Sequence, residues 1–195
     1  MKYKQSDIQF MQSDKLVESH QVFDGKIMQV YVNKLAIEPE VVVERELIHH
    51  QPAVAVLPVL SDQRVILVKQ YRAAVDRDLY EIPAGILDLV DGEYEEALVG
   101  ARRELEEETG YQAAHWQSIG GCYVSPGFLD EYIELFLARG LTEVEEPLAQ
   151  DPHENVTHHI FSRAQVQAML ADGDIIDAKT IVALQHWLLA IEQEA

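Results

Sequence analysis

The sequence of 195 residues is poor in cysteine, in basic side chains and in long apolar runs. Its one cysteine, Cys122, excludes an intramolecular disulfide framework and a cysteine-rich metal site. Fifteen Lys and Arg residues stand against 34 Asp and Glu residues, so the formal net charge is -19 and binding to nucleic acid or anionic lipid is disfavoured. The longest nearly apolar run, residues 52–60, is too short to span a bilayer, and the N-terminal stretch lacks the apolar core of a signal peptide. We therefore expect a cytoplasmic protein with no nucleic-acid or membrane partner.

The remaining composition is that of an ordinary globular chain, with 48% hydrophobic residues. Alternating or β-branched segments bounded by turn residues predict strands over 16–24, 27–37, 41–48, 53–60, 64–70, 119–124 and 132–138. Helical periodicity predicts helices over 97–109, 162–171 and 178–192, and the acidic stretch 142–154 reads as a loop. Strands, a helix, strands and helices in this order predict a mixed-sheet α/β fold rather than repeating βαβ units.

Two groups of glutamates lie on the helix over 97–109, whose opening turns we expect to begin at about residue 92. We expect the first group in the opening turns, where carboxylates favour the positive end of the helix dipole: Glu93, Glu95 and Glu96. The second group, Glu104, Glu107 and Glu108, is spaced i, i+3 and i+4 and therefore shares one face near the end that disfavours anions. Oxygen-only ligands of this kind suit Mg²⁺ or Mn²⁺, whereas the alternative is a solvated acidic helix face.

Residues 103–111, which read RELEEETGY, resemble the second half of the Nudix hydrolase signature, and Pro83-Ala84-Gly85 resembles the loop that opens it. Nine residues separate Gly85 from Glu95, where the family has five. The four extra residues fall around 89–92, so either Glu93 or Glu95 takes the position of the first signature glutamate. The spacing of the second glutamate group is unaffected.

The resemblance extends over nearly the whole chain to the ADP-ribose pyrophosphatase branch, through residues 70–72, 80–85, 125–127 and 177–180. It implies a Nudix fold, a mixed β-sheet sandwiched between helices, in residues 51–195. It also implies a small N-terminal antiparallel β-sheet subdomain in residues 1–50 that forms a homodimer. The implied activity is Mg²⁺-dependent hydrolysis of ADP-ribose to AMP and ribose 5-phosphate, with Mn²⁺ as a possible substitute. The alternatives are hydrolysis of GDP-mannose or another nucleotide sugar, and a non-catalytic ADP-ribose-sensing module.

The same resemblance assigns the metal to Glu104, Glu107, Glu108 and the carbonyl of Ala84. Glu107 is in addition expected to take part in catalysis. A base must accept the proton of the attacking water, and the acidic loop supplies Glu154 as base or added ligand, with Asp151 as the competing choice.

The expected substrate contacts fall outside the signature helix. They are Arg45, Glu46, Arg72, Glu81, Ile86, Ser125, Gly127 and Glu131. Arg72 is the best candidate for a substrate phosphate because a guanidinium group binds phosphate with two parallel hydrogen bonds. Arg45 and Glu46 are expected to reach the nucleotide across the dimer interface. Arg103 is instead expected to pair with a signature carboxylate and fix its conformation.

Overall fold

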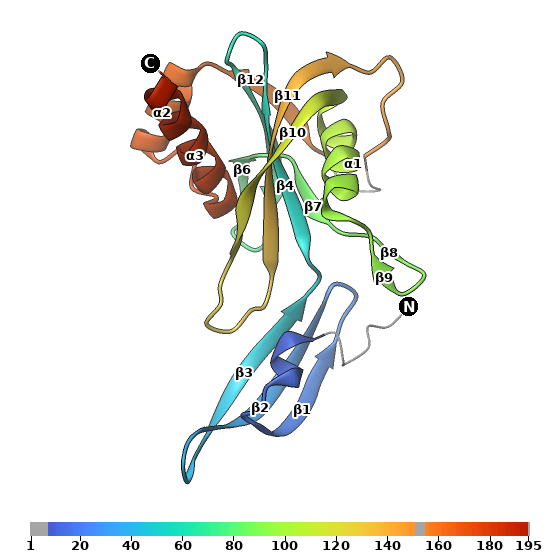
Figure 1. The fold of residues 1–195 in the computed structure, drawn as a ribbon, viewed down its shortest axis with the longest axis vertical. Helices are drawn as coiled ribbons and strands as arrows, with labels where there is room; N and C mark the ends of the chain where they lie inside the picture. Colours follow the sequence, from blue (N-terminus) through green and yellow to red (C-terminus); the bar gives the residue numbers. More distant parts are fainter. Residues whose placement is uncertain (1–7, 151–154, 195) are drawn as a thin grey trace.

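The computed structural model describes residues 8–150 and 155–194, which form two larger β-sheets, a small two-stranded hairpin and helices (Figure 1). A three-stranded antiparallel sheet extends from the rest of the protein at the bottom of Figure 1. It comprises β1 (Leu16–Asp24), β2 (Met28–Glu38) and β3 (Val41–His50), and the short helix η2 (Gln9–Gln12) lies against it. This matches the small N-terminal sheet expected from the sequence.

The larger sheet is seven-stranded and mixed, with the order β10-β11-β4-β5-β12, and with β6 beside β5 and β7 beside β4. Its strands are β4 (Ala53–Val59), β5 (Val65–Arg72), β6 (Arg77–Glu81), β7 (Ala84–Ile86), β10 (Tyr111–Tyr123), β11 (Tyr132–Glu143) and β12 (Thr157–Phe161). The helices are α1 (Ala97–Thr109), α2 (Arg163–Asp172) and α3 (Ala178–Glu194). Among the described residues, no helix has the length and apolar character needed to cross a membrane.

Strand β4 is the centre of the core because every one of its residues is buried. Its side chains alternate between two clusters, since successive residues of a strand face opposite sides. Leu57 packs in the cluster that contains Trp187 of α3, and Val56 packs in the cluster that contains Leu105 of α1. Helices therefore cover both faces of the mixed sheet, as Figure 1 shows, and the expected fold class is confirmed.

The approach to α1 differs from the sequence prediction. The predicted opening turns are wrong, because Asp91 and Gly92 have φ values of 53° and 90°, which an α-helix does not allow. They form the turn of a small hairpin, β8 (Leu89–Val90) with β9 (Glu93–Tyr94), and the helix begins only at Ala97. The four residues in excess of the family spacing are thus accommodated in a hairpin.

The connection of residues 124–131 between β10 and β11 docks onto the end of β3. His49 Nδ1 lies 2.7 Å from Asp130 Oδ2, and the backbone N–H of His50 donates to Asp130 Oδ1 at 2.8 Å. The carbonyl of Ile48 accepts from the N–H of Asp130 at 3.1 Å. These contacts attach the N-terminal sheet to the larger sheet.

Candidate active site

The second glutamate group lies on the inner face of α1. Helix α1 ends at Gly110, which has a φ of 74° and donates its N–H to the carbonyl of Glu106 at 2.8 Å. Leu105 packs in the core on the same face of the helix. Its neighbours Glu104 and Glu108 are therefore held against the sheet, where both are buried. Buried carboxylates require compensating partners, so their surroundings decide what this face can bind.

The loop opened by Pro83-Ala84-Gly85 packs directly on these carboxylates. The N–H of Ala84 donates to Glu108 Oε2 at 3.1 Å. A Cβ atom at Gly85 would lie 2.0 Å from Glu104 Oε1, so only glycine leaves room for the Glu104 carboxylate in its present position. The loop and the helix therefore meet through the acidic groups, although the chain separates them by the whole β8–β9 hairpin.

Arg103 is surrounded by carboxylates. Its Nη1 lies 2.6 Å from Glu104 and 3.1 Å from Glu107, its Nη2 lies 2.7 Å from Glu95, and its Nε lies 3.5 Å from Asp88. Burial lowers the pKa of Arg103, but the hydrogen bond that Arg103 donates to Glu95 and the charge of Glu104 outweigh burial and raise that pKa above its usual range. The expected pairing with a signature carboxylate is confirmed. One guanidinium against four carboxylates leaves an excess of negative charge.

A second ion-pair network lies beside the loop. Arg72 binds both oxygens of Glu81 through Nε and Nη2, at 2.6 and 2.7 Å. Lys179 of α3 also binds Glu81 and lies 3.1 Å from Asp177. Burial raises the pKa of Glu81, but the hydrogen bonds from Arg72 and the charge of Lys179 outweigh burial and hold that pKa below its usual value.

The donor set fits a hard divalent cation by its chemistry, because three carboxylates and backbone carbonyls are the ligands that Mg²⁺ and Mn²⁺ prefer. The close approach of Gly85 to Glu104 keeps those donors under the loop. Among the described residues, no three acidic, histidine or cysteine side chains are yet gathered as a metal cluster. Glu104 and Glu107 turn instead toward Arg103. A bound cation would therefore compete with Arg103 for these carboxylates.

Three of the expected substrate contacts lie in the 124–131 connection. The carbonyl of Ser125 accepts from the N–H of Leu129 at 3.0 Å, which makes this segment a turn, and Gly127 is exposed within it. Glu131 Oε1 lies 3.7 Å from His50 Nδ1. The segment is thus held against β3.

The other expected contacts are dispersed. Ile86 is half-buried in β7, and its carbonyl accepts from Arg103 Nη2 at 3.2 Å. Arg45 and Glu46 are exposed on β3, in the N-terminal sheet, and as neighbours in a strand they face opposite sides. These two residues are not among the groups that contact α1 or its loop.

Glu154 and Asp151, the two candidates for the base, lie outside the described residues. The flanking residues are held together by one side chain. The side-chain amide of Gln150 donates to the carbonyl of Val156 at 2.9 Å and accepts from the N–H of Val156 at 3.2 Å. This double hydrogen bond joins the chain on the two sides of residues 151–154.

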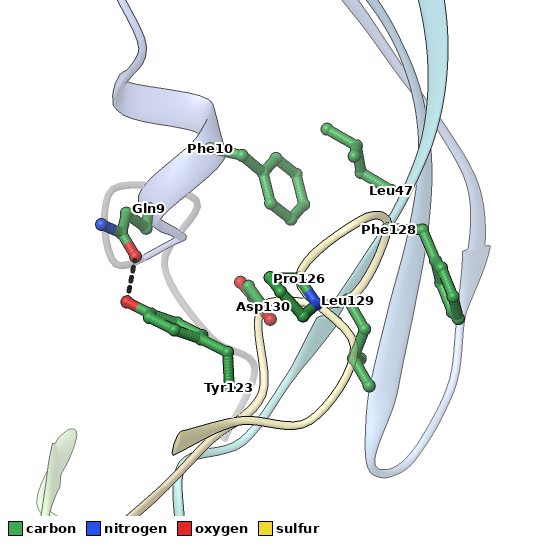
Figure 2. Close-up of a pocket in the computed structure, with 8 residues that line it drawn as sticks. All are labelled: Gln9, Phe10, Leu47, Tyr123, Pro126, Phe128, Leu129 and Asp130. Carbon is green, nitrogen blue, oxygen red and sulfur yellow. Dashed lines mark hydrogen bonds between the residues drawn. The ribbon is translucent and has the colours of Figure 1, made fainter. Parts of the chain in front are cut away.

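A cavity of about 290 Å³ lies between η2, β3 and the 124–131 connection. Figure 2 shows Phe10, Leu47 and Tyr123 around it, and Tyr123 donates a hydrogen bond to the side chain of Gln9 at 3.4 Å. Asp130 also lines the cavity, and none of the signature carboxylates does. The cavity is therefore separate from the acidic face of α1.

Two participants in the ion-pair networks were not selected from the sequence. Lys179 belongs to residues 177–180, which resemble the family without assigning this residue a role, and its partner Glu81 is 98 residues away. The sequence signal near Lys179 is a helix-capping pattern, in which Asp177 precedes Thr180 by three residues. This pattern predicts the start of a helix but does not reveal the contact with Glu81. For the first signature glutamate, the sequence allows either Glu93 or Glu95. The structure brings Glu95 to Arg103, whereas Glu93 is exposed in β9.

Comparison with known proteins gives the same family. Residues 49–184 match the NUDIX domain. A Bacillus subtilis protein named ADP-ribose pyrophosphatase is 37% identical over 173 residues, which cover 89% of this chain and 91% of that protein. A Bacillus methanolicus protein named methanol dehydrogenase activator is 32% identical over the same shares of the two chains. A crystal structure titled as an ADP compounds hydrolase has a TM-score of 0.77 at 22% identity, covering 90% of this chain and 94% of that one. With a matching domain over most of its length and a similar fold, the chain belongs to the Nudix hydrolase family, whose members use divalent metal cations.

Proposed function

We propose that this protein is a Mg²⁺-dependent pyrophosphatase that hydrolyses the diphosphate of ADP-ribose to AMP and ribose 5-phosphate. The observation that carries the proposal is the acidic face of α1, with Glu104, Glu107 and Glu108 intact and the Ala84–Gly85 loop packed on it. The Bacillus subtilis relative bears the name of this activity and aligns with nearly the whole chain.

The proposed metal ligands are Glu104, Glu107, Glu108 and the carbonyl of Ala84, with Mn²⁺ as an alternative to Mg²⁺. A divalent cation neutralises the oxygens of a diphosphate and acidifies a bound water. The excess negative charge around Arg103 supports this assignment, because a cation would offset it. The net charge of -19 is a further reason to expect a bound cation, since the protein would otherwise repel an anionic substrate.

The proton of the attacking water requires an acceptor, for which we propose Glu154, with Asp151 as the competitor. Support comes from the acidic composition of this loop and from the Gln150–Val156 hydrogen bonds at its base. Glu107 is proposed to assist from α1, because it is the least buried of the three signature glutamates.

Arg72 is proposed to bind a phosphate of the substrate. Its bonds to Glu81 use Nε and Nη2, and its side chain is partly exposed. The remaining proposed contacts come from several parts of the structure, namely Glu81 paired with Arg72, Ile86 in β7, Ser125, Gly127 and Glu131 in the 124–131 connection, and Arg45 and Glu46 on β3. Arg45 and Glu46 are proposed to act on the nucleotide bound by a second copy of the chain, because they lie on the N-terminal sheet and not on the sheet that packs on α1.

We further propose that residues 1–50 form a dimerisation subdomain and residues 51–195 the hydrolase domain. The N-terminal sheet has three strands, and a sheet this small depends on a packed apolar face for its stability. Its large exposed apolar side chains support a contact with a second copy: Val17, Val22, Phe23, Ile27, Met28, Ile37, Val41 and Val42. Light scattering should give twice the mass of 22.1 kDa, and a monomeric mass would contradict this proposal.

A nucleotide-sugar panel tests the substrate. ADP-ribose, GDP-mannose, UDP-glucose and NADH are each incubated with the protein and Mg²⁺, and a phosphatase releases phosphate from the products. Parallel reactions contain EDTA. Metal-dependent preference for ADP-ribose supports the proposal, and preference for GDP-mannose or another nucleotide sugar replaces the substrate but keeps the chemistry. Tight binding of ADP-ribose without turnover would favour a sensor.

A further inference from the structure

The network at the start of α3 contains a buried lysine that the Nudix signature does not include. Lys179 Nζ binds Glu81 and lies 3.1 Å from Asp177, and its side chain is only 9% exposed. Glu81 is in turn bound by both Nε and Nη2 of Arg72. Two cations therefore share one buried carboxylate, at the edge of the loop that packs on α1.

We propose that Lys179 is a positioning residue that keeps Arg72 aimed at the diphosphate of the substrate and offsets the negative charge of Glu81 beside it. The inference rests on the proposed function, since it concerns how Arg72 binds a phosphate. Lys179 itself does not contact the substrate in this proposal. It acts through Glu81.

The burial of Lys179, Glu81 and Arg72 supports the proposal that Lys179 acts on Arg72 through Glu81. The side chains of Lys179 and Glu81 are 9% and 2% exposed, whereas that of Arg72 is 40% exposed. Arg72 is thus the end of the network that meets solvent. Within the described part of the chain, its Nη1 makes no hydrogen bond, so one edge of the guanidinium remains available.

The charge balance explains why a second cation is needed. Arg72 and Lys179 together balance Glu81 and Asp177, so the four-group network as a whole is neutral. Lys179 supplies a further positive charge to the same carboxylate, while Asp177 compensates Lys179 and lies at the N-terminus of α3, which also favours an anion. Removing the charge of Lys179 leaves the four-group network with a net charge of -1 next to the diphosphate.

The start of α3 also binds the backbone just before the Ala84–Gly85 loop. The Thr180 hydroxyl accepts from the N–H of Ile82 at 2.9 Å and donates to Asp177 Oδ2 at 2.6 Å. Ile82 lies two residues before Ala84, which is bound to Glu108. A purely structural role for the network is therefore the competing explanation, and the test must separate charge from structure.

The test is a charge-rescue series with ADP-ribose and saturating Mg²⁺. Lys179→Met keeps the length of the side chain and removes its charge, and we expect KM to rise about ten-fold while kcat stays within about two-fold. Asp177→Asn keeps a helix-capping side chain, and it should lower KM because the network gains a net positive charge. The double variant restores neutrality, so its KM should return most of the way to the wild-type value.

Lys69→Met is the matched control. Lys69 lies on β5 near Arg72, and its ion pair with Asp78 at 3.1 Å is exposed. The control removes the same charge from the surface and should leave KM unchanged. If Lys179→Met does not fold, Asp177→Asn alone decides: a lower KM supports the proposal, and an unchanged or higher KM overturns it.

Two outcomes in folded variants would overturn the inference. One is a Lys179→Met variant in which kcat falls and KM does not rise. The other is a double variant that shows no recovery of KM, which would mean that structure and not charge was lost. Failure of the proposed function is distinguished by the wild-type protein: if it hydrolyses no nucleotide sugar, the proposed function fails before any variant is compared.

Discussion

The backbone N–H of Ala84 donates to the buried carboxylate of Glu108 at 3.1 Å. This hydrogen bond joins the loop before the β8–β9 hairpin to the last turn of α1. It orients one oxygen of Glu108 toward the loop, and it provides a structural reason why the loop and helix parts of the Nudix signature must occur together.

Glu108→Gln should abolish most of the activity without loss of the fold. An amide oxygen can still accept the Ala84 hydrogen bond, but the negative charge that a metal requires is gone. We expect turnover of the preferred nucleotide sugar to fall by at least about 100-fold, with a melting temperature equal to or slightly above that of the wild type. Glu106→Gln is the matched control, because Glu106 binds Gln112 and the N–H of Leu148 away from the loop. Near-normal turnover in Glu108→Gln would remove α1 from the mechanism.

Gly85→Ala should weaken metal binding. The added Cβ would overlap the Glu104 carboxylate, which is the end of a flexible side chain and can move aside. The fold should therefore survive while one proposed ligand is displaced. We expect about ten-fold more Mg²⁺ for half-maximal turnover, and the Mn²⁺ affinity measured by calorimetry should fall in parallel. An unchanged metal requirement would show that the position of Glu104 does not matter for the cation.

Arg103→Gln should destabilise the protein, because Glu95, Glu104 and Glu107 would lose their shared cation. We expect a loss of about 3 kcal/mol in the free energy of unfolding in EDTA, measured with urea. Mg²⁺ should stabilise this variant more than the wild type, since it would no longer compete with the guanidinium. Arg102→Gln makes the same charge change at an exposed position and should cost far less. Equal losses in the two variants would contradict the central role of Arg103.

The free energy of unfolding should fall in acid because Glu81 becomes protonated. The pKa of Glu81 is held below its ordinary value of 4.5 in the folded protein, so the folded state favours the ionised form. This contribution to the free energy of unfolding is fully present above the ordinary carboxyl value and is lost as pH falls through the lowered one. Urea unfolding between neutral pH and about pH 3 should show this loss, and Glu81→Gln should have a shallower slope in the acid range. Identical slopes would show that Glu81 is not ionised preferentially in the folded state.

The sequence predicted local features well where one element carried its own signal. Helix α1 follows from apolar periodicity and from Gly110, and β4 follows from a continuous apolar run that is buried on both faces. Strand β10 was predicted too short, because it is an edge strand with many exposed residues and an irregularity between Ser118 and Gly121. Alternation is weak under those conditions.

The site residues were predictable from the sequence only where they lie close together on one element. Glu104, Glu107 and Glu108 are recognisable because their spacing on one helix is local. The sharing of Glu81 by Arg72 and Lys179 joins strands and a helix 98 residues apart, so no local pattern could reveal it. The position of Glu95 beside Arg103 likewise depends on the hairpin turn at Gly92.

Product analysis of ADP-ribose tests the central claim most directly. ADP-ribose is incubated with the wild-type protein and with Glu108→Gln, each in Mg²⁺ and in EDTA, and the products are separated by chromatography and identified by mass. The account predicts equimolar AMP and ribose 5-phosphate from the wild type in Mg²⁺ alone. Intact ADP-ribose in that reaction, or equal cleavage by Glu108→Gln, would contradict it.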